Sequence, residues 1–485
     1  MQSGIGDRSP SQIKGAGLNA TGRKRILHYH PEGRGIGDPN PFFWKGEYHI
    51  FDTMGHGGWG HRVSGDLAWL AELPDAFYAG APGEPDARSC AAGSVIERGG
   101  IFHIFYCARR LTPEKKVVAT ICHATSQDLV HWTKDPGNPL ITPDFDPSRQ
   151  GANKDPFVFW NEEEKCYWML ITDQLVSPAG SRFGVLGLAA STDLENWERR
   201  EPFWTPSITT AEFEVPDLFE WNGTWYLLYT TYTENYQTHY RMAEHFSGPW
   251  LAPALDSFGD SVFYAGKTIS DGKRRFVLGW LYGLSAAEGD SPRALSIREL
   301  TQQPDGSLTV KCPQEILRSC GPAIPANLEA KLGDCFAEGK TLRAQSVDGL
   351  AYAVTENVPA DLLVETTVTL KPGTRCAGIF FRTTPDLNRG YVLRLEPPFC
   401  RVVFDRWPKS RPIKQFLGSR PLHPSQFSWD EPISIQLFIH GNIAEVFVGN
   451  RVALATRMYD HKDGCVGVFV ENGEAKFEGL TLRSI

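Results

Sequence analysis

Three acidic side chains lie at matching places in a repeated sequence pattern. They are Asp38 in GDPNPFFW, Asp155 in NKDPFVFW and Glu214 in EFEVPDLFEW. Each comes just before an aromatic strand that leads through a turn into a second aromatic strand. Because a repeated β unit brings equivalent positions to one centre, we expect the three carboxyl groups to share one pocket. Two or three carboxylates in one pocket are typical of a site that cleaves glycosidic bonds.

Such carboxylates have distinct tasks. Hydrolysis with retained configuration needs two carboxyl groups about 5–5.5 Å apart, one of which attacks the anomeric carbon. The other has a raised pKa, protonates the leaving oxygen and then activates water. Burial and neighbouring negative charge raise such a pKa. A single Asp before Pro is more often a turn residue, but three acids in three repeats favour the catalytic interpretation.

The elements that must position these acids are repeated hairpins. Each has an apolar strand, a turn rich in Gly, Asn or charge, and a second apolar strand with aromatics. A second motif, S-x-D-L followed by Trp, alternates with the first three hairpins, and we expect its Asp to form a turn and its Trp to pack between blades. Two motifs in one phase predict a five-bladed β-propeller rather than a long β-sandwich. The hairpins span 42–52, 94–106, 157–172, 218–230 and 267–280, and the second motif spans 64–69, 126–132 and 191–197.

The pattern changes after about residue 316. Alternating apolar runs with turns every eight to twelve residues predict an antiparallel β-sandwich, and a chain of 485 residues is long enough for two domains. The predicted fold class is therefore all-β, a five-bladed β-propeller followed by a C-terminal antiparallel β-sandwich. The expected organisation is a flexible N-terminal segment (1–24), the propeller (25–320), a linker (321–345) and the sandwich (346–485).

Composition limits the partners. A net charge of -8 argues against nucleic acid, which selects basic surfaces. The N-terminus lacks the apolar run of a signal peptide and no stretch of 18 apolar residues occurs, so we expect no membrane span and a cytoplasmic location. The ten cysteines are scattered without a C-x-x-C pair, which predicts free thiols and no zinc site. We expect no cofactor and no metal, a small carbohydrate as substrate, and a monomer or dimer.

The order of motifs resembles glycoside hydrolase family 32, which contains invertases, inulinases and levanases. The resemblance covers about residues 26–485 and implies a five-bladed propeller, a β-sandwich and a retaining mechanism on fructofuranosides. It implies that Asp38 is the nucleophile, Asp155 stabilises the transition state and holds hydroxyls, and Glu214 is the acid/base. The motifs are GDPNP (37–41), WGHRVSGDLAWL (59–70), AGSV (92–95), KDPFV (154–158), EVPDLF (214–219), FYAGKT (263–268), GW (279–280) and ALSIREL (294–300).

The same motifs suggest residues that contact the sugar. Trp59 is a candidate apolar wall, although a Trp that packs between blades is the alternative. Ser94 is a candidate near the pocket, with an ordinary strand Ser as the alternative, and Tyr232 is a candidate for the leaving-group side or a plain loop residue. The predicted substrate-binding residues are Asn40, Trp59, Ser94, Lys154, Tyr232 and Trp280.

The chain also departs from the family pattern. Gly37 stands where the family has a sugar-binding Asn, and Thr53 where it has Gln. Lys154 replaces the Arg of Arg-Asp-Pro, which exchanges a planar fork for a point charge, and Val215 replaces a Cys. The catalytic carboxylates are thus retained while recognition groups differ, which predicts a retained mechanism on an unusual fructoside or another furanoside.

Four functions remain open from the sequence. The first is hydrolysis of terminal fructofuranosyl residues of a small fructoside or fructooligosaccharide. The second keeps the covalent intermediate but passes the sugar to another hydroxyl, as a fructosyltransferase or a difructose-anhydride enzyme does. The third is hydrolysis of another furanoside, such as an arabinofuranoside. The fourth is an inactive carbohydrate-binding relative, which the presence of all three acids disfavours.

Overall fold

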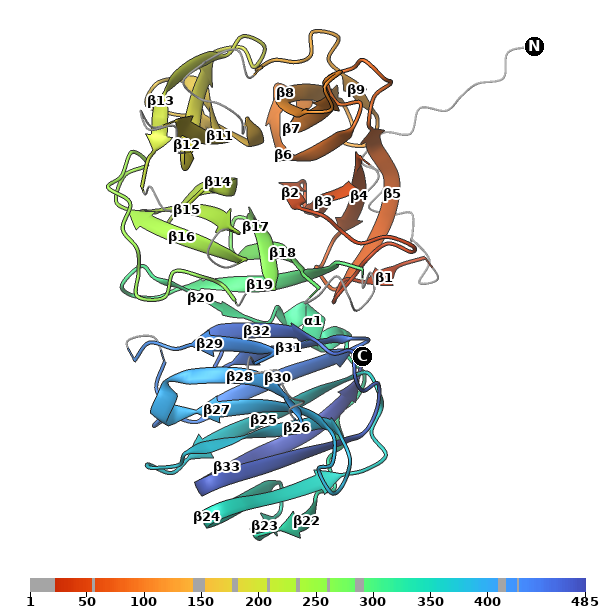
Figure 1. Cartoon of the computed structure of the whole chain (residues 1–485), viewed down its shortest axis with the longest axis vertical. Coiled ribbons are helices and arrows are strands. Elements are labelled where there is room, and N and C mark those ends of the chain that lie inside the picture. The colour runs from red at the N-terminus through yellow and green to blue at the C-terminus, as the bar shows by residue number, and fades with distance from the viewer. Residues whose placement is uncertain are drawn as a thin grey trace, which may run out of the picture.

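The computed structural model describes residues 22–54, 57–142, 153–176, 182–206, 210–232, 236–259, 262–283, 292–408, 416–424 and 427–485. Residues 1–21 of the predicted flexible segment lie outside this range. Five separate antiparallel sheets follow one another along the chain and surround a common centre, and a larger sheet lies beside them (Figure 1). The predicted five-bladed propeller and the C-terminal β-sandwich are confirmed.

The blades have the following strands. Blade I contains β1 (Lys24–Arg25), β2 (Pro39–Trp44), β3 (Glu47–Met54), β4 (Gly58–Ser64) and β5 (Trp69–Tyr78). Blade II contains β6 (Ser89–Arg98), β7 (Ile101–Leu111), β8 (Val117–Ser126) and β9 (Trp132–Lys134). Blade III contains β10 (Lys154–Asn161), β11 (Cys166–Val176), β12 (Arg182–Ser191) and β13 (Glu198–Trp204). Blade IV contains β14 (Glu214–Trp221), β15 (Thr224–Thr231) and β16 (Gln237–Ala243), and blade V contains β17 (Phe263–Ser270), β18 (Arg275–Leu281), β19 (Ala294–Gln302) and β20 (Leu308–Lys311).

The first main strand of each blade forms the inner ring. β2, β6, β10, β14 and β17 contact one another in ring order, and β17 closes the ring on β2. The second strand of a blade is covered on both faces, because successive residues point to opposite faces and both meet a neighbouring blade. In β7, for example, Ile104, Phe105 and Tyr106 are all fully buried. The inner strands are therefore held rigidly around the axis.

The S-x-D-L motif forms the turn that leads into the outer strand of a blade. Asp193 Oδ1 accepts hydrogen bonds from the backbone N–H groups of the next turn, at 2.8 and 2.9 Å, and Leu194 is left-handed with φ 73°. Trp197 packs edge-on against Phe105 of the preceding blade, at 5.5 Å between ring centroids. The predicted roles of Asp in a turn and Trp between blades are confirmed for this copy of the motif.

The C-terminal strands are hydrogen-bonded into one 13-stranded sheet that forms the sandwich. Its long last strand, β33 (Cys465–Ser484), pairs with β21, β24, β25 and β26 and so connects the layers. The other strands are β21 (Ile324–Pro325), β22 (Glu329–Leu332), β23 (Asp334–Glu338), β24 (Thr341–Thr355), β25 (Leu362–Leu370), β26 (Cys376–Thr383), β27 (Gly390–Glu396), β28 (Arg401–Trp407), β29 (Gly418–Pro421), β30 (Ile433–His440), β31 (Ile443–Val448) and β32 (Val452–Arg457). Residues 321–345, expected to be a linker, instead contain β21, β22, β23 and the start of β24, because their short strands pair with β24 and β33.

The two domains share one continuous core. The helix α1 (Gln314–Ser319) lies between blade V and the sandwich (Figure 1), and a single buried apolar cluster contains residues from both sides. At its centre the Glu445 carboxylate of β31 accepts hydrogen bonds from Arg298 at 2.7 Å and pairs with His28 at 3.0 Å. The pKa of Glu445 falls to about 2 because these partners outweigh its burial. An ionised network therefore fixes the domain interface.

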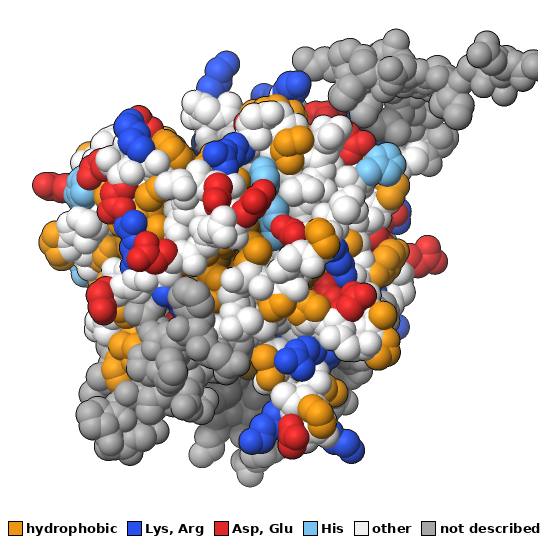
Figure 2. Space-filling view, turned by 90° about the horizontal axis from the view of Figure 1, so that it is seen from above, with side chains coloured by type: hydrophobic (Ala, Val, Ile, Leu, Met, Phe, Trp, Pro, Cys, Tyr) orange, Lys and Arg blue, Asp and Glu red, His pale blue; other side chains and the backbone are white. Residues whose placement is uncertain are grey.

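Surface charge, cysteine pairing and helix length can each be compared with what the sequence predicts. Acidic and basic side chains are interspersed on the propeller end of the molecule, without a broad patch of one sign (Figure 2). All ten cysteines are free. Among the described residues, no helix is long and apolar enough to cross a membrane.

Neutralising Glu445 tests the interface network. Glu445→Gln leaves the Arg298 guanidinium buried without a counter-charge, which we expect to lower the free energy of unfolding by about 3 kcal/mol. Urea unfolding measures the change. Glu163→Gln, which neutralises an exposed carboxylate paired with His245, is the matched control and should leave stability unchanged, and equal effects of the two variants would contradict the assignment.

Candidate active site

Four of the inner strands, β6, β10, β14 and β17, have a register shift near their start. In β10, β14 and β17 the shift contains a non-glycine residue with a left-handed backbone. A β-bulge of this kind changes the direction of a side chain that would otherwise follow the strand alternation. The left-handed residues are Asp155 (φ 52°), Val215 (φ 46°) and Ala265 (φ 54°).

The register corrects the alignment of the three acids. Glu214 and Lys154 each pair with a threonine of the next strand just before the bulge, so these two residues are equivalent. Asp155 is equivalent to Val215, one residue later. The prediction that the acids occupy matching places is therefore wrong by one residue for Asp155, because the bulge, rather than the strand alternation, directs its side chain.

The three carboxyl groups nevertheless share one electrostatic site. The negative charge of Asp155 raises the pKa of both Asp38 and Glu214. Tyr264, on β17, experiences all three acids: burial raises its pKa most, and the charges of Glu214, Asp38 and Asp155 add to this effect. Acids from blades I, III and IV thus act on one tyrosine of blade V.

Asp38 lies one residue before β2 and is held by an aromatic donor. The indole Nε1 of Trp280 donates to Asp38 Oδ1 at 2.9 Å. Burial and the charge of Asp155 raise the pKa of Asp38, whereas the Trp280 hydrogen bond and the charges of Arg293 and Lys267 lower it. The Arg293 guanidinium lies 5.0 Å from the centre of the Trp280 ring. One oxygen of the carboxylate is therefore oriented by an indole N–H, and the positive charges of Arg293 and Lys267 act on the group.

The surroundings of Glu214 suit a general acid. Lys154 Nζ donates to Glu214 Oε1 at 2.8 Å, and the Tyr264 hydroxyl donates to Oε2. Burial raises the pKa of Glu214, Lys154 opposes this, and the charge of Asp155 raises it further, to about 7. Glu214 therefore holds its proton to a higher pH than an ordinary glutamate does.

Asp155 is buried and anchored from two neighbouring strands. Its Oδ2 accepts from the Thr172 hydroxyl of β11 at 3.3 Å and from the backbone N–H of Val215 in β14 at 3.2 Å. Only 4% of the residue is exposed. These contacts fix Asp155 between blades III and IV.

A buried lysine lies beneath the acids. Lys267 Nζ donates to Asn40 Oδ1 at 3.2 Å and to the Gly93 carbonyl, while the Gly93 N–H donates to the same Asn40 oxygen at 3.0 Å. Asn40 Nδ2 in turn donates to the Asp38 carbonyl at 3.0 Å. Asn40, predicted to bind substrate, is 1% exposed and supports the backbone of Asp38 in this structure.

Two departures from the family pattern are neighbours in space. A Cβ atom at Gly37 would lie 2.0 Å from Thr53 Oγ1 and 2.4 Å from its carbonyl oxygen. Thr53 Oγ1 accepts the backbone N–H of Asp38 at 3.0 Å. A side chain at position 37 would therefore collide with both the hydroxyl and the backbone carbonyl of Thr53.

Three predicted sugar contacts have structural partners. Trp59 is fully buried and its indole donates to the Ala91 carbonyl at 2.9 Å, which favours the packing alternative. Ser94 is 7% exposed and its hydroxyl accepts from the backbone of Val158 at 3.0 Å, between blades II and III. Tyr232 lies at the carboxylate cluster, where its hydroxyl donates to Glu212. Its direct contact with a sugar stays a prediction.

Several site residues escaped the sequence reasoning. Glu212 shares the Lys154 ammonium with Glu214. Arg109 of β7 lies near the acids: burial opposes its positive charge, but Cys107, Asp155 and Asp38 raise the pKa of its guanidinium. Glu212 stands only two residues before Glu214, which was a usable signal, whereas nothing near Arg109 in the sequence relates it to a carboxylate.

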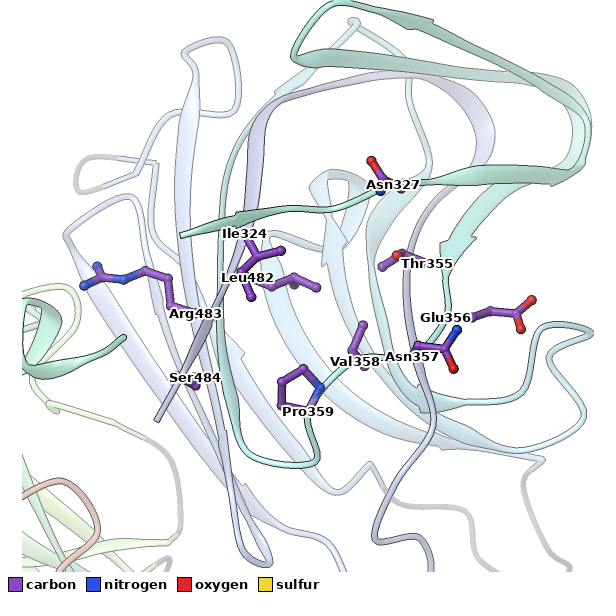
Figure 3. Close-up of a pocket in the computed structure, with 10 residues that line it drawn as sticks. All are labelled: Ile324, Asn327, Thr355, Glu356, Asn357, Val358, Pro359, Leu482, Arg483 and Ser484. Carbon is purple, nitrogen blue, oxygen red and sulfur yellow. The ribbon is translucent and has the colours of Figure 1, made fainter. Parts of the chain in front are cut away.

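A pocket lies in the sandwich, and its lining does not include the carboxylate cluster. It is formed by the start of β21, the loop after β24 and the end of β33, and Glu356 is its one carboxylate (Figure 3). A single acid lacks the partner that glycoside cleavage needs. Nowhere in the described part of the chain do three or more His, Cys, Asp or Glu side chains group so that they could hold a metal ion.

Comparison with known proteins gives consistent matches. Residues 28–304 match the profile of the glycosyl hydrolases family 32 N-terminal domain, and residues 339–484 match that of the family 32 C-terminal domain. A beta-fructofuranosidase, insoluble isoenzyme, of Arabidopsis thaliana is 28% identical over 52% of this chain and 50% of its own length. The levanase of Bacillus subtilis is 29% identical over 40% of this chain and 28% of its own length. The matches thus span half or less of these two relatives.

Solved structures share the fold along nearly the whole chain. Sucrose-6-phosphate hydrolase from Lactobacillus gasseri superimposes with a TM-score of 0.73 at 16% identity, over 98% of this chain and 95% of that one. Fructan 1-exohydrolase IIa from Cichorium intybus, in complex with 1-kestose, gives a TM-score of 0.70 at 19% identity, over 95% and 97%. At these identities the likeness concerns the fold alone.

The raised pKa of Glu214 predicts a pH-dependent stability. Between pH 4.5 and about 7 the folded protein keeps a proton on Glu214 that the unfolded chain releases, so the stability of the wild type falls as pH rises through this window. Glu214→Gln stays neutral and should gain about 3 kcal/mol relative to wild type between pH 4.5 and 7. Thermal unfolding from pH 4 to 8 measures this difference.

The control is Glu220→Gln, on the exposed part of the same strand. The difference in Tm between Glu220→Gln and wild type should stay constant from pH 4.5 to about 7. A Glu214→Gln difference that is equally flat would show that Glu214 titrates as an ordinary carboxyl group.

Proposed function

This chain belongs to glycosyl hydrolases family 32, and from that premise we propose that it is a retaining hydrolase of terminal fructofuranosyl residues in a small fructoside or fructooligosaccharide. The observation that carries the proposal is the contrast between two carboxyl groups at one site. Asp38 is oriented by an indole N–H, whereas Glu214 has a pKa of about 7. An oriented nucleophile and a protonated acid are the two parts of a retaining mechanism.

The residues have separate roles in each step. The Asp38 carboxylate attacks the anomeric carbon and forms an ester with the sugar, while Glu214 gives its proton to the leaving oxygen. Glu214, now ionised, takes a proton from water, and the resulting hydroxide attacks the anomeric carbon and releases Asp38. Asp155, fixed by Thr172 and Val215, binds sugar hydroxyls and offsets the positive charge that develops on the ring.

The substrate differs from that of a typical invertase in this proposal. Gly37 and Thr53 stand where the family has two side chains that contact the sugar. Lys154 donates hydrogen bonds to two carboxylates. These changes alter recognition without altering the acids. They also support a second candidate, another furanoside such as an arabinofuranoside, because a sugar with fewer or differently placed hydroxyls does not need the lost contacts.

Product analysis tests the function. Wild type and Asp38→Asn are incubated with sucrose, kestose, inulin, levan, difructose anhydrides and an aryl arabinofuranoside, and products are separated by chromatography. We expect free fructose from at least one fructoside. We also expect this protein to cleave sucrose more slowly than a typical invertase does. Asp38→Asn should lose more than about 10³-fold in kcat/KM, because it removes the nucleophile.

Asp193→Asn is the matched control, because Asp193 forms a surface turn and Asn accepts the same backbone hydrogen bonds. It should keep wild-type activity. Release of arabinose alone would select the second candidate, and an Asp38→Asn variant as active as wild type would remove the proposed nucleophile.

A further inference from the structure

Glu212 is a carboxylate of the site that the reaction above does not use. It stands two residues before Glu214, and its side chain is 11% exposed. Its Oε1 accepts from Gln174 Nε2 at 3.2 Å, and its Oε2 accepts from the Tyr232 hydroxyl at 3.1 Å and from Lys154 Nζ. Donors from three separate segments therefore hold one buried carboxylate in place.

Lys154 lies between the two glutamates. Its Nζ pairs with Glu212 Oε2 and, at 2.8 Å, with Glu214 Oε1, and only 14% of the Lys154 side chain is exposed. A buried ammonium needs a counter-charge, because burial without one costs several kcal/mol. Glu212 supplies that counter-charge when Glu214 carries a proton, so the Lys154–Glu212 pair is neutral by itself.

Without Glu212, Glu214 would be the carboxylate left in an ion pair with Lys154, although the charge of Asp155 would still act on the ammonium. An opposite charge within hydrogen-bond distance favours the ionised form of a carboxyl group. An ionised Glu214 has no proton to give to a leaving oxygen. The ammonium that positions the acid would then also disable it at neutral pH.

We propose that Glu212 is a positioning residue that neutralises Lys154, so that Glu214 stays protonated for donation to the leaving group. This inference rests on the proposed function, in which Glu214 is the acid. It explains why Lys154 is tolerated beside a general acid, and it assigns Tyr232 and Gln174 to the orientation of Glu212.

Other charged and titratable groups around Glu214 do not replace Glu212. Asp155, on β10, raises the pKa of Glu214 and stabilises the Lys154 ammonium by its charge, but its carboxylate is held by hydrogen bonds from Thr172 of β11 and Val215 of β14. Tyr264, on β17, donates a hydrogen bond to Glu214, and Tyr232 after β15 faces it as a neutral phenol. Lys154 forms ion pairs with two carboxylates, Glu214 and Glu212.

A titration without substrate tests the inference separately from the function. Protein labelled with ¹³C at the glutamate carboxyl carbon is titrated by NMR from pH 4 to 9, and the Glu214 signal is assigned by its absence in Glu214→Gln. We expect a wild-type midpoint of about 7. Glu212→Gln should lower the midpoint by about one pH unit or more, because Lys154 then pairs with Glu214 alone.

A second substitution separates electrostatics from structural damage. Lys154→Met should raise the Glu214 midpoint, and adding Glu212→Gln to Lys154→Met should change it much less than Glu212→Gln does in wild type. Glu220→Gln, on the exposed part of β14, is the control and should leave the midpoint unchanged. The basic limb of kcat/KM on an active substrate should move to lower pH in Glu212→Gln together with the midpoint.

An unchanged or raised Glu214 midpoint in Glu212→Gln would overturn the inference, as would an equal effect of Glu212→Gln with and without Lys154. If no fructoside is cleaved but the midpoint falls as expected, the proposed function fails while the role of Glu212 in the electrostatics of the site stands.

Discussion

The ammonium of Lys267, buried at the propeller axis, is the interaction on which the site depends. It belongs to blade V, yet it donates to Asn40 of blade I and to the Gly93 carbonyl of blade II. Burial lowers its pKa to about 8, while the charges of Asp155, Asp217 and Asp38 oppose that effect. The carboxylates favour the charged form of Lys267, and the charge of Lys267 in turn lowers the pKa of Asp38.

This mutual dependence links the closure of the propeller to its chemistry. The inner strands converge because the blades pack on both faces, and the bulges in β10, β14 and β17 direct Asp155, Glu214 and Tyr264 toward one another. Positive groups then differentiate the acids: Arg293 and Lys267 act on Asp38, and Lys154 acts on Glu214. Burial and the charge of Asp155 raise the pKa of both carboxyl groups, and a different set of positive groups opposes the rise at each.

The sequence predicts the repeated features of this molecule better than the local ones. The hairpin and S-x-D-L periodicity indicates five blades, and the DP and EVPD motifs lead to Asp38, Asp155 and Glu214. A one-residue bulge is invisible to such counting, which is why Asp155 is aligned with the wrong equivalent. Trp59 shows a second limit, because a motif position does not reveal that the side chain is fully buried. Residues 321–345 have few aromatics yet form strands, because pairing with β24 and β33 decides their structure.

The central claim is that Asp38 forms a covalent bond to the sugar. The most direct measurement is mass spectrometry of peptides from enzyme quenched in acid during turnover of the best fructoside. We predict one hexosyl unit on the peptide that contains Asp38, and a larger fraction of that adduct in Glu214→Gln with a substrate whose leaving group needs no proton, because the acid/base is then missing for the attack by water. An adduct on another peptide, or an unmodified enzyme that releases fructose of inverted configuration, would contradict the account.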